Sequence, residues 1–71
     1  MTFDVELDRE DDGRWIADVV ALPGVLAYGQ TLDEAMMRAK SLALRVLADK
    51  LERGEINAQD FHFEPRELLA V

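Results

Sequence analysis

The chain lacks cysteine altogether and is poor in proline and aromatic residues, with two prolines, one tryptophan and one tyrosine among 71 residues. Without thiols, neither a disulfide nor a thiolate metal site can stabilise the fold. No apolar run approaches the ~20 residues that a transmembrane helix needs. The acidic, alternating N-terminal stretch is also unlike a signal peptide. These absences favour a cytoplasmic protein with no membrane contact.

Basic residues are scarce as well. Eight Lys and Arg face fifteen Asp and Glu, and the net charge is -7 at pH 7. Sequence-independent binding to nucleic acid depends on Lys and Arg that neutralise phosphates, so we expect no direct nucleic-acid contact. An acidic surface points instead to a basic protein partner, or only to solubility.

The length allows one small domain, which we place at residues 1–71. Folding must offset roughly 100 kcal/mol of conformational entropy, and a two-layer domain of this size supplies little surplus. With no disulfide available, self-association is the remaining means of stabilisation. We therefore expect a homodimer or homotetramer.

The first twenty residues predict a β-hairpin. Residues 1–8 alternate strictly between apolar and acidic side chains, which is the period of a half-buried strand. Residues 9–13 end in the Asp-Gly pair of a tight turn. Residues 14–20 form the returning strand, whose second face carries Ile16, Asp18 and Val20 and is less polar than a solvated face should be. A partner would cover that face.

A corner and a helix start follow the hairpin. Pro23 and Gly24 fit a type II turn, because proline fixes φ and glycine accepts a positive φ. Residues 25–29 predict a short third antiparallel strand. Thr31 then offers an N-cap oxygen, and Glu34 is placed to reach back to the Thr31 N–H as in a capping box.

Residues 32–53 show the three-and-four spacing of an amphipathic helix, closed by Gly54. We expect its apolar side to pack on the sheet, against Trp15 and its neighbours. Residues 61–64 predict a fourth strand, parallel to an earlier one through a right-handed crossover. The pattern indicates an α+β, two-layer fold in the order β-β-β-α-β.

The sequence offers weak candidates for chemistry. Four acidic residues in the first hairpin, Asp8, Glu10, Asp11 and Asp12, could be imagined as a magnesium site, but adjacent acids in a turn mostly point outward. His62 has no serine or cysteine nucleophile nearby. Gly24 and Gly29 lack the spacing of a phosphate loop. We expect no catalytic residue, no metal and no cofactor.

Three short motifs together carry a family resemblance. D-D-G-x-W-x-A at residues 11–17, L-P-G at 22–24 and G-x-T-x-x-E-A at 29–35 are similar in order and spacing to the HicB antitoxin family. The resemblance implies a partial ribonuclease-H-like fold with the fourth strand beside the first. It also implies a type II antitoxin that binds a small basic HicA-type toxin and masks its messenger-RNA-cleaving site. The DNA-binding domain that many HicB proteins carry is not in this sequence, so the resemblance is to a stand-alone form.

Two functions remain open. The favoured one is a non-catalytic antitoxin, or a solitary oligomeric relative with another role. The alternative is a degenerate metal-dependent nuclease that uses the acidic hairpin. For the antitoxin, the candidate partner-binding residues combine charge with apolar anchors: Asp4, Glu6, Asp8, Ile16, Asp18 and Val20.

The remaining predictions concern self-association and local structure. We expect the oligomer to form through a sheet edge or the C-terminal segment, with Phe61, Phe63, Leu68, Leu69 and Val71 at the interface. Residues with purely structural roles are predicted at turns and helix ends: Pro23, Gly24, Gly29, Thr31, Glu34 and Gly54.

Overall fold

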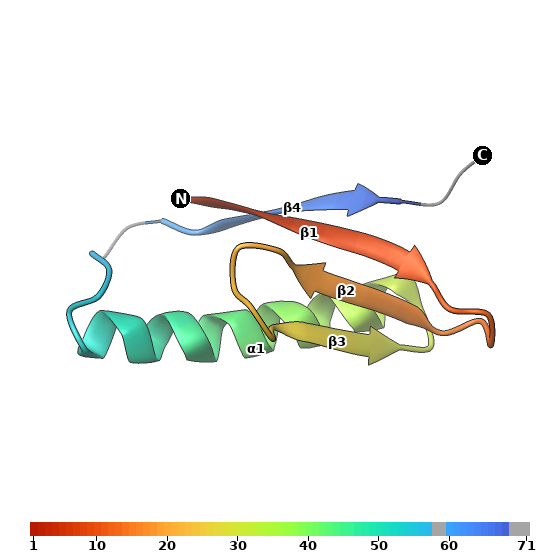
Figure 1. Ribbon diagram of the computed structural model, residues 1–71, viewed down its shortest axis with the longest axis horizontal. Coiled ribbons are helices and arrows are strands. Elements are labelled where there is room, and N and C mark those ends of the chain that lie inside the picture. The colour runs from red at the N-terminus through yellow and green to blue at the C-terminus, as the bar shows by residue number, and fades with distance from the viewer. Residues whose placement is uncertain (58–59, 69–71) are drawn as a thin grey trace.

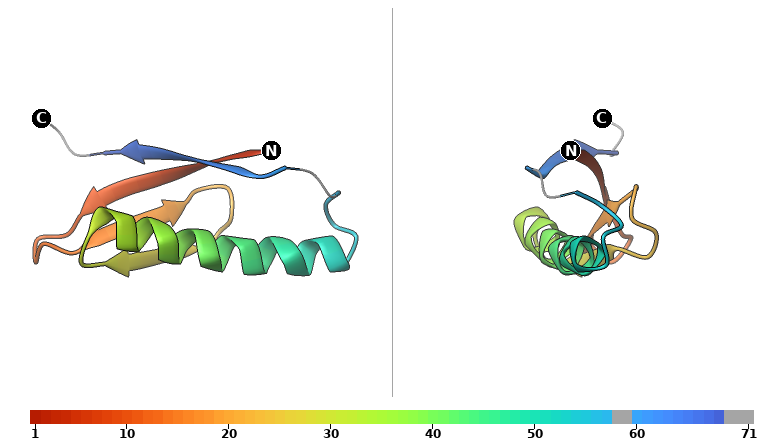
Figure 2. Two further views of the ribbon diagram at one scale, coloured as in Figure 1. Left: turned by 180° about the vertical axis from the view of Figure 1, so that it is seen from behind. Right: turned by 90° about the vertical axis from the view of Figure 1, so that its left-hand side faces the viewer.

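A computed structural model describes residues 1–57 and 60–68 of the chain. In this part of the chain the elements are β1 (Thr2–Arg9), β2 (Trp15–Val19), β3 (Leu26–Gly29), α1 (Leu32–Glu52) and β4 (His62–Glu67). They form one four-stranded sheet in the order β3-β2-β1-β4, and α1 packs along one of its faces (Figures 1 and 2). β4 is parallel to β1, and the other pairs are antiparallel. The predicted α+β fold is confirmed, including the fourth strand beside the first. Within the described ranges, no helix is long and apolar enough to cross a membrane.

The core lies between the sheet and α1. The inward side chains of β1 are Phe3, Val5 and Leu7, each at most 4% exposed. The facing side of α1 is largely alanine, which lets the helix lie close to the strands. The core residues of α1 are Ala35, Met36, Ala39, Ala43 and Leu47. Trp15 is only half-buried, packs against the rim of this core, and has the Arg9 guanidinium 5.6 Å from its ring centroid.

Two glycines before the helix serve different needs. Gly24 has a φ of +82°, as the predicted turn requires, and a Cβ there would meet nothing within 4 Å. Gly29 has no such backbone requirement. A Cβ on Gly29 would lie 2.4 Å from the backbone nitrogen of Ala35. The end of β3 therefore touches the first turn of α1 so closely that only glycine fits.

The predicted N-cap is confirmed, but its partner bond is not the one expected. The Thr31 hydroxyl accepts a hydrogen bond from the Glu34 N–H at 3.1 Å. The Glu34 carboxylate accepts from the Gln30 N–H at 3.0 Å, and not from the Thr31 N–H. Glu34 also lies 3.4 Å from Arg38. Because Arg38 donates to the Tyr28 carbonyl at 3.0 Å, it draws the Glu34 carboxylate toward the end of β3.

The helix ends one residue earlier than predicted, at Glu52, and Arg53 is its C-cap. Gly54 has a φ of +73° and its N–H donates to the Leu51 carbonyl at 3.1 Å. The Glu55 N–H donates to the Lys50 carbonyl at 2.9 Å. This pair of bonds is the Schellman motif, which satisfies carbonyls that would otherwise be left free at the helix end.

The fourth strand was predicted at residues 61–64, and this range is wrong. The strand runs from His62 to Glu67 and passes through Pro65. A proline is tolerated here because β4 is an edge strand and the Pro65 nitrogen faces away from β1. Phe61 lies just outside the strand, and its ring and that of Phe63 pack on Phe3, with centroids 6.1 Å and 5.6 Å away.

Candidate protein-binding surface

The sheet face opposite α1, called the outer face below, is produced by the alternation in β1 and β2. Because Phe3, Val5 and Leu7 point to the helix, the residues between them point outward. These are Asp4, Glu6 and Asp8. In β2, Ala17 and Val19 are fully buried, and Ile16 and Asp18 take the outer face.

Strand register places acidic residues directly beside one another on the outer face. Glu6 is opposite Asp18 on β2, and Asp4 is opposite Glu64 on β4. Like charges directly opposite one another in a sheet are destabilising. Asp8 is opposite Ile16, so this end of the outer face combines an acidic and an apolar side chain. The predicted acidic residues are thus brought together as one stripe: Asp4, Glu6, Asp8 and Asp18.

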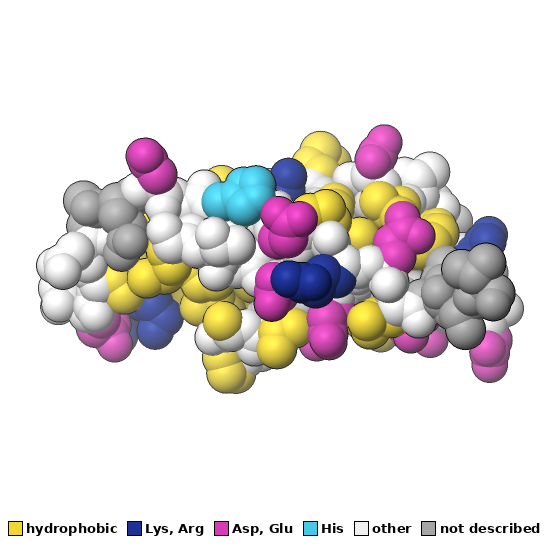
Figure 3. Space-filling view, turned by 90° about the horizontal axis from the view of Figure 1, so that it is seen from above, with side chains coloured by type: hydrophobic (Ala, Val, Ile, Leu, Met, Phe, Trp, Pro, Cys, Tyr) yellow, Lys and Arg dark blue, Asp and Glu magenta, His cyan; other side chains and the backbone are white. Residues whose placement is uncertain are grey.

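The stripe has one basic neighbour, Arg66 of β4, which is opposite Glu6 in the strand register. Arg66 on β4 lies 3.0 Å from Asp4, and this carboxylate raises the pKa of Arg66 above its ordinary value. In the part of the chain that the structure describes, no basic side chain forms an ion pair with Glu6, Asp8 or Asp18. Seen from the β4 side, acidic side chains stand among hydrophobic ones, with a basic side chain among them near the middle (Figure 3).

Apolar side chains border the stripe on the β3 side. Val20 is 51% exposed, and Ile16 is half-buried. Two further residues of the outer face were missed by the sequence analysis: Leu26 is next to Asp18, and Tyr28 is next to Ile16. The signal for them is the alternation Leu-Ala-Tyr-Gly in β3, which puts Leu26 and Tyr28 on one face. The Arg14 guanidinium lies 4.7 Å from the Tyr28 ring centroid and covers it.

The acidic hairpin does not form a metal site in the described structure. Asp12 is engaged by Arg14, whose Nε lies 2.8 Å from its carboxylate. The Arg14 backbone N–H also donates to Asp12, and this bond is the main reason that the pKa of Asp12 is lowered. Across residues 1–57 and 60–68, no three acidic or histidine side chains are grouped so that they could hold a metal ion.

Comparison with known proteins places the chain in a family. Over 53 residues, 75% of each chain, it is 32% identical to a UPF0150 protein of Thermoplasma acidophilum. The chain belongs to the UPF0150 family. No family model and no solved structure matches it.

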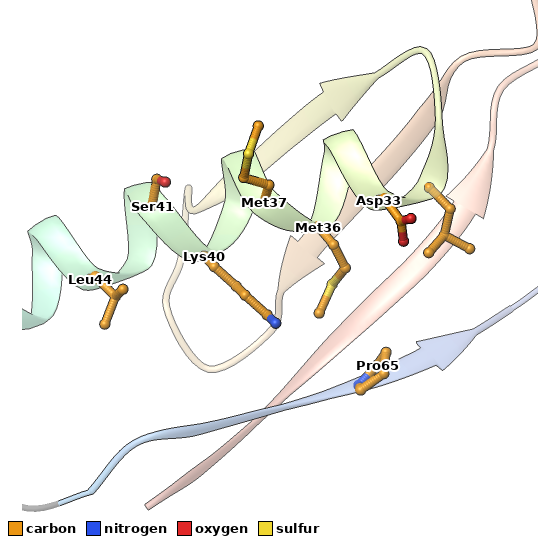
Figure 4. Close-up of a pocket in the computed structure, with 8 residues that line it drawn as sticks. Asp33, Met36, Met37, Lys40, Ser41, Leu44 and Pro65 are labelled. Atoms are coloured by element: carbon orange, nitrogen blue, oxygen red, sulfur yellow. The ribbon is translucent and has the colours of Figure 1, made fainter.

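A second feature of this UPF0150 chain is a groove on the helix side, between α1 and β4 (Figure 4). It has a volume of about 510 Å³ and lies where α1 leaves β4 uncovered. Met37 is 60% exposed and Leu44 49% exposed at its helix wall. Met36 and Lys40 point from α1 toward Pro65 on β4, whereas Met37 points the other way (Figure 4). Asp33, Lys40 and Ser41 supply the polar part of the lining. The sequence analysis did not anticipate this groove, because it depends on how α1 and β4 lie relative to each other across the sheet.

The residues predicted for self-association lie on or near β4. Phe61 and Phe63 are half-buried against Phe3, so part of their surface is already used within the chain. Leu68 is 52% exposed. Leu69 and Val71 lie outside the described residues. His62 is exposed on the outer face, with its Nε2 atom 2.8 Å from the Glu64 carboxylate.

Proposed function

We propose that this UPF0150 protein is a HicB-like antitoxin, which binds a small basic HicA-type toxin and masks its RNA-cleaving site without catalysing a reaction itself. The observation that carries the proposal is the position of Glu6 directly opposite Asp18. Within the described structure neither carboxylate forms an ion pair, since Arg66, which is opposite Glu6 on β4, pairs with Asp4 instead. Repulsion between Glu6 and Asp18 is a cost in the free chain. A cationic partner would remove that cost.

Three further observations support a basic protein partner. The net charge of -7 favours fast encounter with a positively charged surface. The apolar residues beside the stripe, Ile16, Val20 and Leu26, can be buried when a partner covers the outer face. The likeness of the three motifs to HicB antitoxins adds the class of partner. A toxin that binds RNA must present a basic surface, which is the electrostatic complement of this face.

The first experiment asks whether the locus encodes a small basic protein beside this chain, and titrates that protein calorimetrically at two salt concentrations, together with an assay of RNA cleavage. We expect tight binding that weakens with salt and stops the cleavage. Asp18→Asn is expected to raise the free energy of unfolding by ~0.5 kcal/mol, because it removes a like-charge pair. The same change is expected to weaken toxin binding.

Glu55→Gln is the matched control, since it removes one exposed carboxylate at the far end of α1, away from the sheet. It should leave both quantities unchanged. If Asp18→Asn and Glu55→Gln have equal effects on binding, the partner does not use the outer face. If no RNA-cleaving neighbour binds, the antitoxin assignment is wrong, and a solitary role as an oligomeric protein replaces it.

A further inference from the structure

One side of α1 carries apolar residues that the core does not use. Met37 and Leu44 are outside the buried set of the helix and are 60% and 49% exposed. The small residues Ser41 and Ala48 are exposed as well. Successive members of this group are four, three and four residues apart, so they form one row along the helix. This row, called the solvent-side row below, is about 16 Å long, or about three turns.

The solvent-side row has the pattern of a helix-packing site. Steps of four and three residues are those of the a and d positions of a coiled coil, against which a second helix packs. The large Met37 and Leu44 alternate with the small Ser41 and Ala48, which leaves room for side chains of a second helix between them. Figure 2 shows α1 in front of the sheet, with no described element over its outer side.

Basic residues border the row on both sides. Lys40 precedes Ser41 and points toward β4 (Figure 4), and Arg45 follows Leu44 on the opposite side of the row. Within the described residues, neither Lys40 nor Arg45 forms an ion pair. Residues 35–48 contain three basic residues and no acidic one, in a chain with a net charge of -7. The row is therefore a local basic surface on an acidic protein.

We propose that the solvent-side row of α1 binds an acidic amphipathic helix of another protein. The apolar side chains of that helix pack between Met37 and Leu44, over the small Ser41. Its carboxylates lie beside Lys40 and Arg45, which occupy the g and e positions that select a coiled-coil partner by charge. A second copy of this chain lacks this complementarity, because its own row brings basic residues to the same contact.

This site is separate from the acidic outer face. The outer face and α1 are on opposite sides of the sheet, so a protein bound to one leaves the other accessible (Figure 2). The two surfaces also select partners of opposite charge. The helix site therefore does not depend on the proposed function.

The test is fluorescence anisotropy of a labelled synthetic peptide of three heptads, with isoleucine at a, leucine at d and glutamate at e and g. A matched peptide has glutamine in place of each glutamate. At 0.15 M salt the Debye length is about 8 Å, so the outer face beyond the sheet repels the peptide little. We expect the glutamate peptide to bind with a Kd below about 100 μM, and the glutamine peptide at least about tenfold more weakly. If the glutamate peptide does not bind at this concentration, or both bind equally, the proposal is wrong.

Two variants with unchanged charge identify the surface. Leu44→Gln removes an exposed apolar side chain from the row, and we expect the glutamate peptide to bind at least about tenfold more weakly. Leu26→Gln makes the same change on the outer face, where Leu26 is 39% exposed, and should leave binding unchanged. Equal effects of the two variants would place the peptide elsewhere and overturn the proposal.

A double charge reversal tests the basic border. We expect Lys40→Glu combined with Arg45→Glu to weaken binding of the glutamate peptide at least about tenfold. Lys50→Glu combined with Arg53→Glu is the control, since it makes the same change in net charge at the end of α1, away from the row. Circular dichroism establishes that each variant is folded. If both pairs weaken binding equally, net charge alone is responsible and the row is not the site.

The other possible occupant of the row is a second copy of this chain. Sedimentation velocity of the wild type and of Leu44→Gln across a range of concentrations distinguishes the two. We expect the same mass for both proteins at each concentration. If the wild type associates and Leu44→Gln does not, the row is an interface between copies of this chain, and the proposal is wrong.

Discussion

At the scale of single residues, the contact between Gly29 and Ala35 is the tightest constraint in the fold. A Cβ at Gly29 would lie 2.4 Å from the Ala35 nitrogen and 2.9 Å from its Cα. These are backbone atoms of the first helical turn and cannot swing aside as a side chain can. The constraint therefore fixes the distance between β3 and the start of α1.

Replacing Gly29 tests this constraint. We expect Gly29→Ala to lower the free energy of unfolding by about 2–3 kcal/mol, since the helix or strand must shift to admit a methyl group. Gly24→Ala is the comparison, because Gly24 has free space but a φ of +82°, for which the cost is about 1 kcal/mol. Urea denaturation of the two variants measures both. Equal losses would mean that the Gly29 contact is not tight in solution.

The carboxylates of the outer face differ in their charged neighbours. Arg66 of β4 is opposite Glu6 in the strand register and lies 3.0 Å from Asp4, whereas the cross-strand neighbours of Asp18 are Glu6 and Leu26. The alternation of β1 and β2 predicted that these carboxylates share a face. It could not predict their register, because which residue stands opposite which depends on how the hairpin closes.

At the scale of elements, α1 is defined by its two ends. Its N-terminus has the Thr31 hydroxyl bond and the acidic residues Asp33 and Glu34, which suit the positive end of the helix dipole. Its C-terminus has the Schellman bonds around Gly54. The Thr31 cap and the glycine at the helix end were predicted from residue type, because capping is a local interaction within four residues of the chain. The bond from Glu34 and the last helical residue were not.

The N-cap gives a prediction at this scale. Thr31→Ala removes the acceptor for the Glu34 N–H, and we expect the free energy of unfolding to fall by about 1 kcal/mol. Thr31→Ser keeps a hydroxyl in place and should recover most of that loss. Thermal or urea unfolding measures both variants. If serine is no better than alanine, the hydrogen bond contributes nothing and the loss comes from the threonine methyl group.

β4 shows where element prediction failed. The fourth strand was predicted to end at residue 64, just before a proline, a residue that is excluded from central strands and from positions whose N–H would face a neighbour. Here the Pro65 nitrogen faces the open edge, so the strand continues to Glu67. Whether the even-numbered or the odd-numbered residues of β4 face β1 is set by the register of β4 on β1. That register is a contact between segments about sixty residues apart.

At the scale of the whole molecule, the two edges of the sheet decide how the protein meets other chains. The β3 edge is covered at Tyr28 by Arg38, and the β4 edge is open. Arg38 comes from the helix, ten residues after the carbonyl that it covers. Arg38 therefore occupies the Tyr28 carbonyl, and so hinders pairing at the β3 edge, only once α1 has packed on the sheet.

Removing the Arg38 side chain should promote association of the chain through the β3 edge. We expect Arg38→Ala to increase concentration-dependent light scattering, because the Tyr28 carbonyl becomes free to accept from another strand. Arg45→Ala is the control, since Arg45 is exposed on the same helix and loses the same charge. If both variants scatter equally, the change comes from net charge and not from the edge.

The sequence by itself determined the kind and order of the elements and the inner and outer faces of β1, β2 and α1, because alternation, helical spacing, caps and turns are all local signals. It also placed four of the acidic residues on one face. Only the tertiary structure decided the register that sets Glu6 against Asp18, the approach of Gly29 to Ala35, the groove beside α1 and the inequality of the two edges. Each of these depends on the distance and alignment between segments far apart in the chain, which packing of the whole core sets.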